Sequence, residues 1–409
     1  MQKAIELGIG FVTGRANVCN IVNNYYKEMI KQVKKLDRAI NITLFILYDL
    51  SYRGTDRLEF YKIIPAVYKD INIKFITPED IEEEKKRIIA RTDLNYDEVN
   101  LLFGNGHARG RNTLMHFAYR DNMDYLLFWD DDEYPVANIK KNNSIEWKKQ
   151  NNINMHIKNI EYADVTIGYH CGYISPIPYI DLKDKITEEE FKDFIEAISN
   201  DIISWESIKE KLVKDNGITY ADEDIASEKG IYEIKEYKGG KWVAGSTLCL
   251  NLNHIDKIPA FFNPPNARGE DTFFATKLSE SKVLKVPVYH FHDGFLMYKE
   301  IMEEEYPTKL KKAEVDNEKN QIEKRFYNAT IGWIRYKPLL MYITDKENYY
   351  ENIKVIKEKL EKSIPKINEI FNEYDFNILI DEFDKYSGNV LNDYNDYIKT
   401  NEVWNRLKK

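Results

Sequence analysis

Four consecutive acidic residues, Asp130 to Glu133, directly follow an apolar run that starts at Leu126. Such a run is typical of a strand buried on both faces, so the acids would lie at its carboxyl end, where open α/β sheets bind ligands. Because alternate residues of a strand face the same way, Asp130 and Asp132 could share one face. Two carboxylates on one face repel each other unless a cation lies between them, and a hard divalent ion fits that need. A solvated acidic turn that closes the strand is the alternative, and this segment alone does not decide between the two.

A second acidic pair, Glu270 and Asp271, precedes an apolar helical segment that starts at Thr272. A carboxylate at the mouth of the sheet could act as a general base and take the proton from an attacking hydroxyl. The simpler interpretation is a helix N-terminus, where acids interact favourably with the helix dipole and cap free amides. For an isolated pair, the simpler interpretation is favoured.

Two histidines, His290 and His292, close an apolar run that extends from Val283 to Val288. At positions i and i+2 they share one face of a strand. Such a pair is more often structural than ligating, but an imidazole beside carboxylates would suit Mn²⁺ better than Ca²⁺.

A glycine-rich segment from Gly104 to Asn112 contains two arginines, Arg109 and Arg111. Glycines let the backbone approach a ligand closely, and both arginines could pair with phosphates. A helix expected to start near Asn112 would add its positive end. A flexible loop with a helix cap is the alternative, and the dinucleotide and P-loop fingerprints are absent.

Polar residues also follow the first two predicted strands, over residues 5–13 and 42–49. Thr13 and Arg15 lie at the end of the first strand, and Asp49 ends the second. Each alone is consistent with a simple strand terminator. Together with the acids they predict a crevice at one sheet edge of the kind that accepts a nucleotide.

The elements that would position these residues alternate between strand and helix over the first 135 residues. This alternation predicts an α/β fold with a mostly parallel, Rossmann-like central sheet and helices on both faces. Residues 181–238 are polar with a helical pattern and predict an insertion. Strand patterns end near residue 306, so we expect a catalytic domain over 1–305 and a helical appendage over 306–409.

Charge, cysteine content and hydropathy exclude several classes of partner, metal site and location. The formal net charge of −9 argues against nucleic acid, because phosphate backbones require a basic surface. The three cysteines are too far apart for a disulfide framework or a zinc site. No apolar stretch approaches the ~20 residues of a membrane span, and no signal-peptide pattern begins the chain. We expect a cytoplasmic protein, with loose attachment to the inner face of a membrane left open.

In this order, the features resemble the GT-A glycosyltransferases, particularly the family-2-type enzymes that use nucleotide sugars. The resemblance covers roughly residues 4–298 and no single motif in it is specific. Its five matching segments are the Asp-x-Asp at 130–132, a Gly…Ala-Arg-Asn-like segment at 106–112, a small-residue strand at 244–250, the Glu-Asp pair at 270–271 and the strand that ends in histidines. Gly110 interrupts the second segment, so which of Arg109 and Arg111 meets the donor is open. The Gln-x-x-Arg-Trp motif of processive members is missing, which argues against a polymerase.

The resemblance implies a donor site built around a metal ion. Asp132 would be the main ligand of Mn²⁺ or Mg²⁺, and Asp130 would contact the ribose or a metal-bound water. His292 would be the further ligand, with His290 in reserve. Asp49 would recognise the base, commonly uracil, which implies a UDP-sugar donor.

The remaining donor contacts would come from Thr13, Arg15, Asp131 and one of the two arginines, although Asp131 and Glu133 are expected to point away from the metal. Asp271 would be the catalytic base, with Glu270 as second choice. The implied reaction is transfer of a sugar to a hydroxyl of a glycan, lipid-linked or protein acceptor, with inversion at the anomeric carbon.

Two other functions stay open at this point. A sugar-nucleotidyltransferase could use a similar sheet, but it usually carries a basic glycine-rich loop after the first strand, where this chain has only residues 13–16, Thr-Gly-Arg-Ala. A non-catalytic carbohydrate-binding protein with a decayed site is the other. Residues 306–409 lie outside the resemblance, and acceptor binding, membrane docking or homo-oligomer formation are open for them.

Overall fold

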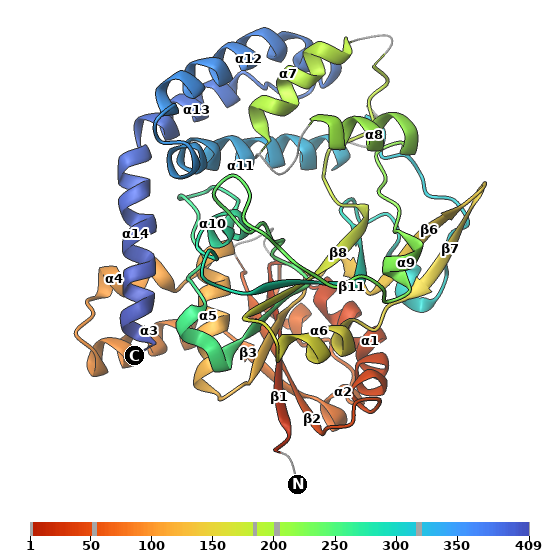
Figure 1. Ribbon diagram of the computed structural model, residues 1–409, viewed down its shortest axis with the longest axis vertical. Coiled ribbons are helices and arrows are strands. Elements are labelled where there is room, and N and C mark those ends of the chain that lie inside the picture. The colour runs from red at the N-terminus through yellow and green to blue at the C-terminus, as the bar shows by residue number, and fades with distance from the viewer. Residues whose placement is uncertain (1–2, 51–54, 183–185, 200–204, 316–320, 409) are drawn as a thin grey trace.

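A mixed β-sheet forms the centre of the computed structural model, which describes residues 3–50, 55–182, 186–199, 205–315 and 321–408 (Figure 1). The strand order is β3-β2-β1-β4-β10-β8-β11-β5, and β9 pairs with β11 beside this path. The strands are β1 (Ile5–Thr13), β2 (Ile40–Tyr48), β3 (Asn72–Ile76), β4 (Tyr125–Phe128), β5 (Glu133–Tyr134), β8 (Val165–Tyr173), β9 (Tyr232–Glu233), β10 (Leu248–Asn251) and β11 (Val283–Asp293). A separate hairpin joins β6 (Val136–Lys141) to β7 (Ser144–Lys149).

The predicted α/β class is confirmed, and so are the strands predicted over the first 135 residues. The sheet is mixed and not mostly parallel as predicted, because its second half contains antiparallel pairs beside the parallel pair of β8 and β11. Strands β3, β2, β1 and β4 run parallel, whereas β10 is antiparallel to both β4 and β8. Leu248 at the start of β10 pairs with Phe128 at the end of β4. Because β10 runs antiparallel to β4, its start lies beside the end of β4. The loop that precedes β10, residues 244–247, therefore lies at the edge of the sheet where the acids are.

Helices cover both faces of the sheet. The helices are α1 (Asn17–Val33), α2 (Val67–Asp70), α3 (Pro78–Arg91), α4 (Tyr96–Leu102), α5 (His107–Arg120), α6 (Asn152–Ile160), α7 (Glu188–Ile198), α8 (Trp205–Asp215), α9 (Glu223–Ala226), α10 (Glu270–Ala275), α11 (Gln321–Thr344), α12 (Tyr349–Ile370), α13 (Ile378–Gly388) and α14 (Val390–Leu407). Short 3₁₀ helices are η1 (Arg57–Tyr61), η2 (Leu252–Lys257) and η3 (Lys299–Glu303).

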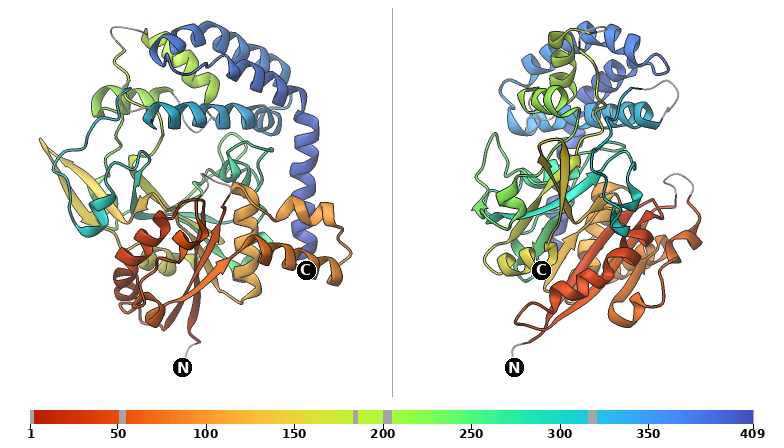
Figure 2. Two further views of the ribbon diagram at one scale, coloured as in Figure 1. Left: turned by 180° about the vertical axis from the view of Figure 1, so that it is seen from behind. Right: turned by 90° about the vertical axis from the view of Figure 1, so that its right-hand side faces the viewer.

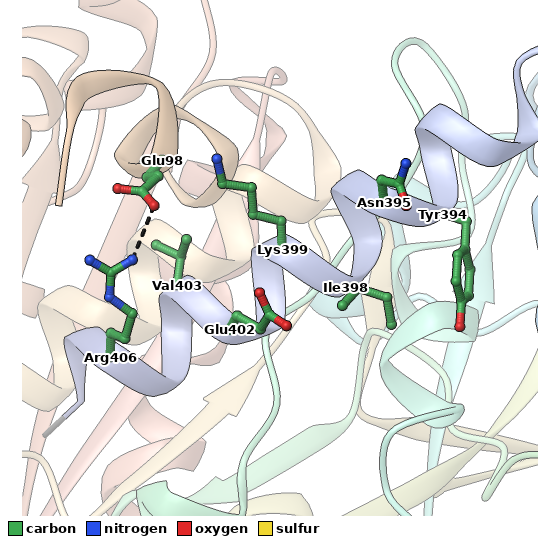
Figure 3. Close-up of a pocket in the computed structure, with 8 residues that line it drawn as sticks. All are labelled: Glu98, Tyr394, Asn395, Ile398, Lys399, Glu402, Val403 and Arg406. Carbon is green, nitrogen blue, oxygen red and sulfur yellow. Dashed lines mark hydrogen bonds and ion pairs between the residues drawn. The ribbon is translucent and has the colours of Figure 1, made fainter.

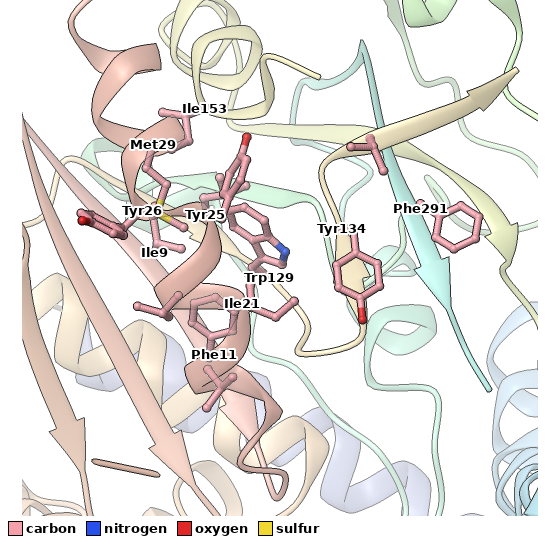
Figure 4. Packing of buried hydrophobic residues seen from close by; sticks show 14 of the residues in the cluster. Ile9, Phe11, Ile21, Tyr25, Tyr26, Met29, Trp129, Tyr134, Ile153 and Phe291 are labelled. Carbon is pink, nitrogen blue, oxygen red and sulfur yellow. The ribbon is translucent and has the colours of Figure 1, made fainter. Parts of the chain in front are cut away.

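Alternate residues of the apolar run before the acids face opposite sides of the sheet, as in any strand, and so belong to two different cores. Leu127 and Trp129 join the core under α1 and α6, and Leu126 and Phe128 join the core under α5. The Trp129 ring lies 5.0 Å from that of Tyr25 on α1 (Figure 4). Both faces of β4 are thus buried, as the continuous apolar run predicts.

The predicted insertion and appendage pack together as one helical region at one end of the sheet (Figure 2). Helices α7 and α8 share a core with α11, α12 and α13, in which the ring centres of Phe194, Phe326 and Phe376 lie within 6.3 Å of one another. The parts of these segments at 183–185, 200–204, 316–320 and 409 lie outside the described residues. Helix α14 then runs back along the sheet region, where its Val403 and Trp404 join the core under α5.

None of the helices in the described ranges is long and apolar enough to cross a lipid bilayer.

Candidate functional site

Asp130, Asp131 and Asp132 lie in a tight turn between β4 and β5, and Glu133 begins β5. Trp129 anchors the turn, because its backbone N–H donates to Gly10 (3.0 Å) and its indole N–H donates to the Glu133 carbonyl (3.1 Å). Since the segment turns, the alternation expected of a strand does not apply. Asp131 and Asp132 face a common arginine, while Asp130 faces another.

The first cluster forms around Arg15. Its guanidinium pairs with Asp131 and lies 3.0 Å from Asp132, and Thr13 Oγ1 donates a hydrogen bond to Asp131. Burial alone would lower the pKa of Arg15, but the two carboxylates outweigh it and raise that pKa. Thr13 and Arg15, predicted to hold the donor, contact the acids directly. The expectation that Asp131 points away is therefore wrong, because Asp131 is buried in the same cluster as Asp132.

Asp132 has two further neighbours. Arg325 Nη2 donates to its Oδ2 at 3.0 Å, and His292 Nε2 lies 3.6 Å from the same oxygen. Burial would raise the pKa of Asp132, but Arg15, His292 and Arg325 hold it well below its usual range. The same carboxylate overrides the effect of burial on His292 and raises the pKa of the imidazole. Asp132 is thus a permanent negative charge at neutral pH.

Asp132 and His292 fit a divalent cation that takes most of its ligands from elsewhere. Their donor atoms are 3.6 Å apart, near the roughly 3 Å between adjacent ligands of a six-coordinate ion bound at about 2.1 Å. Within the described ranges, no three His, Cys, Asp or Glu side chains are grouped to hold a metal ion. The pair therefore suits an ion such as Mg²⁺ or Mn²⁺ that keeps water and phosphate ligands, not an all-protein metal centre.

The second cluster forms around Arg111, which is buried. Its guanidinium donates to the Gly245 carbonyl (2.7 Å), to Asp130 (3.3 Å) and to Glu270 (3.3 Å), and stacks 4.9 Å from the Phe128 ring centre. Arg111 therefore joins the two acidic segments and is not placed to meet a donor phosphate. Asp130 keeps a side chain that is 39% exposed, so it can still contact a ligand.

The helix that carries Arg111 starts earlier than predicted. α5 begins at His107 after Gly106, whose φ of 97° favours glycine, and Asn112 lies inside the helix. A Cβ at Gly110 would come within 2.6 Å of Val12, so this glycine serves the close packing of α5 on β1. Arg109 is exposed on the same helix. Of the two arginines, Arg109 is the one with a free approach to solvent.

Glu270 and Asp271 form the first turn of α10, as the simpler interpretation predicts, yet they also face the site. Asp271 Oδ2 accepts from the Gly245 N–H (3.1 Å), and its Oδ1 accepts from the Thr272 N–H (2.8 Å). Burial and the charge of Glu270 raise the pKa of Asp271 to about 6. Burial would also raise the pKa of Glu270, but the positive charges of His107 and Arg111 outweigh burial and lower that pKa. Two adjacent carboxyl groups whose pKa values are pushed apart are typical of acid–base sites.

His290 is not beside Asp132. It is fully buried, and its Nδ1 lies 3.0 Å from Glu133, whose other oxygen lies 3.1 Å from His170. Ser246 also donates to Glu133. Strands β8 and β11 pair in parallel with His170 opposite His290, which brings both rings to one carboxylate. This cluster fixes the loop before β10, so His290 and Glu133 support the site from behind and His292 is the residue that reaches it.

Three contributors were not predicted: His170, Ser246 and Arg325. His170 follows the segment from Val165 to Tyr169 in β8, and a histidine that follows a largely apolar strand segment is the same pattern that singled out His290. Ser246 lies within the small-residue segment that was expected to be a strand. The sequence around Arg325 carries no pattern that would mark it.

Asp49 lies at the end of β2 on the other side of β1. Its backbone N–H donates to the Thr13 carbonyl (2.9 Å), and its side chain accepts from Asn105 (3.3 Å). It is partly exposed and adjoins the glycine segment before α5. The sheet edge therefore carries Asp49, Thr13 and the acidic turn in neighbouring positions, as predicted.

Gly245 occupies the position where the two acidic segments meet. A Cβ there would lie 2.6 Å from Arg111 Nη2. Because Arg111 is buried against Phe128, it has no room to withdraw, so we expect Gly245→Ala to lower the free energy of unfolding by about 1–3 kcal/mol. Urea denaturation would measure this. The control is Gly388→Ala at the end of α13, where a Cβ meets nothing within 4 Å; equal losses in both variants would contradict the prediction.

A surface groove of about 530 Å³ lies elsewhere, along α14 (Figure 3). Glu98 on α4 and Arg406 on α14 pair across it at 3.0 Å. None of its lining residues belongs to the acidic clusters, so it is not part of this site.

Comparison with protein-family models gives no match, and comparison with curated protein sequences gives none either.

Proposed function

We propose that the protein is a metal-dependent glycosyltransferase of the GT-A type that moves a sugar from a nucleoside diphosphate donor to a hydroxyl acceptor. One observation carries the proposal. Two carboxyl groups with opposite properties, Asp132 and Asp271, occupy one sheet edge, and Arg111 joins the segments that hold them. The first stays ionised beside cations, as charge neutralisation requires, and the second titrates near pH 6, as a general base requires.

In this proposal the donor diphosphate lies at the Asp132 cluster. A Mn²⁺ or Mg²⁺ ion held by Asp132 and His292 would act as a Lewis acid toward the leaving diphosphate. Arg15, 19% exposed beside Asp132, adds a fixed positive charge at the same place. Asp130 is free to contact the ribose, and Asp49 with the adjoining glycine segment offers polar groups to a base such as uracil.

The chemical step belongs to Asp271. Its carboxylate takes the proton of the acceptor hydroxyl, whose oxygen forms a bond to the anomeric carbon while the bond from that carbon to the diphosphate oxygen breaks. A base and a leaving group on opposite sides of the sugar imply inversion. The hydrogen bonds from Gly245 and Thr272 fix the orientation of the carboxylate, which is what positions a base within reach of its proton.

The test is incubation of the full chain with Mn²⁺ and a panel of nucleotide sugars, with release of nucleoside diphosphate followed by chromatography. We expect slow donor hydrolysis with at least one donor, and loss of this activity on chelation of the metal. No turnover together with no metal-dependent nucleoside diphosphate binding would contradict the proposal. Release of pyrophosphate from a nucleoside triphosphate and a sugar phosphate would instead indicate a sugar-nucleotidyltransferase.

A further inference from the structure

Helix α11 of the C-terminal helical region reaches the site at two points. Near its start, Arg325 donates to Asp132 at 3.0 Å. Two turns further on, the Gly332 carbonyl accepts from the Arg268 N–H (3.2 Å), and a Cβ at Gly269 would lie 2.9 Å from the Tyr336 ring. Residues 268–269 lead directly into the acidic pair at 270–271. One helix therefore contacts both the metal-binding end and the base end of the site.

The helical region holds α11 in this position. Lys337 Nζ donates to the carbonyls of Glu196 (2.7 Å) and Ser199 (2.6 Å) at the end of α7. Arg335 forms a bidentate pair with Glu382 on α13, at 2.7 and 3.0 Å. The position of Arg325 over the acidic turn is thus set by contacts made outside the sheet region.

The charges around Asp132 would be out of balance once a cation binds. Asp132 is 4% exposed and already shares its charge between Arg15 and Arg325, whose side chains are 19% and 24% exposed. A divalent ion on Asp132 and His292 would draw that carboxylate away from both guanidinium groups; Arg15 would keep its pair with Asp131, whereas among the described residues Arg325 has Asp132 as its one ion-pair partner. A diphosphate supplies a replacement negative charge, and a planar guanidinium matches its oxygens in pairs.

We propose that Arg325 is a donor-binding residue: it pairs with Asp132 in this structure and transfers its hydrogen bonds to the diphosphate when metal and donor are bound. This inference rests on the proposed glycosyltransferase function and deepens it. It makes the C-terminal helical region a part of the donor site, because Arg325 belongs to that region and would bind the leaving diphosphate.

The test compares three variants in calorimetric titrations with Mn²⁺ alone, and with UDP or uridine in the presence of Mn²⁺. Arg325→Gln removes the charge, Arg325→Lys keeps a charge without the fork, and Lys324→Gln removes an exposed charge from the adjacent position of the helix. We expect Arg325→Gln to weaken UDP binding about 10- to 100-fold and to leave uridine binding unchanged, since only the diphosphate is contacted. Arg325→Lys should lie in between, and Lys324→Gln should match the wild type.

The affinity for Mn²⁺ alone should not fall with the affinity for UDP in Arg325→Gln. Without Arg325, Asp132 is shared with one guanidinium fewer, so the affinity for Mn²⁺ should rise or stay constant while the affinity for UDP falls. General damage to the fold would lower both, and thermal unfolding midpoints of the variants check for it.

Unchanged UDP affinity in Arg325→Gln, with normal metal-dependent binding in the wild type, would overturn the role of Arg325 and leave the proposed function standing. A wild-type protein that binds UDP neither with nor without Mn²⁺, and that binds no other nucleoside diphosphate, would overturn both. If Arg325→Gln fails to fold, equal UDP affinities of Arg325→Lys and the wild type would still contradict the inference.

Discussion

Replacing Asp132 by Asn is expected to abolish Mn²⁺-dependent binding of UDP and to lower donor turnover about a thousandfold. Asn keeps the size of the side chain but loses the charge that Arg15, Arg325 and His292 surround within 3.6 Å. A neutral amide is a poor ligand for a divalent cation, and it no longer offsets the arginines. Calorimetric titration of Mn²⁺ and UDP, with the rate of donor hydrolysis, measures the effect.

Glu133→Gln is the matched control, because it neutralises an acid of the same run that faces His170 and His290 instead. It should cost stability, since the buried His290 and the partly buried His170 lose their carboxylate partner, but leave the affinity for Mn²⁺ within a few-fold of the wild type. Asp132→Asn should lower the free energy of unfolding by about 1–3 kcal/mol, which urea denaturation can follow. Wild-type metal affinity in folded Asp132→Asn would refute the metal site.

The sequence was sufficient to predict the parallel half of the sheet, because that half is encoded locally. β1 and β4 are apolar runs buried on both faces, and such runs stand out without knowledge of their neighbours. The antiparallel direction of β10 could not be predicted, since the period of a strand is the same in either direction. Only its pairing of Leu248 with Phe128 reveals that its start, not its end, lies at the site.

The residues that make up the site were predicted better than their arrangement in space. Asp132 and His292, Glu270 and Asp271, and Thr13 and Arg15 do come together at one edge. Which of Arg109 and Arg111 could meet a phosphate was left open by the sequence, because the environment of Arg111 depends on where the helix begins. A start at His107 places Arg111 one turn inside α5, facing Gly245 and the acids, whereas a start at Asn112 would have left it on an open loop.

Arg325 could not be found from the sequence at all. It lies 193 residues from Asp132 in the sequence. The spacing of apolar residues in its helix indicates which face packs on other helices, but not which residues lie opposite that face. The place of Arg325 in the site depends on the packing of α11 against α7 and α13, and no local rule encodes that packing. Residues that complete a site from a distant region are therefore the ones that require a structure.

The pH dependence of turnover should identify Asp271 as the base. Because burial and Glu270 raise the pKa of Asp271 to about 6, the carboxylate is mostly ionised above pH 7 and protonated below pH 5. A base must be deprotonated to act, so the rate is expected to be constant above about pH 7 and to fall about tenfold per pH unit well below pH 6. Asp271→Asn should lower the rate about 10²- to 10⁴-fold and remove this acid limb.

Glu270→Gln separates the two acids of the pair. The negative charge of Glu270 helps to raise the pKa of Asp271, so its removal should shift the acid limb to lower pH while the plateau rate is largely kept. If Glu270 were the base, the same substitution would remove the activity and Asp271→Asn would not. A rate profile of Glu270→Gln with an unshifted limb would show that the two carboxyl groups do not interact, although they are adjacent and Arg111 contacts Glu270 at 3.3 Å. The direction of the shift therefore tests the electrostatics, and the height of the plateau tests the assignment of the base.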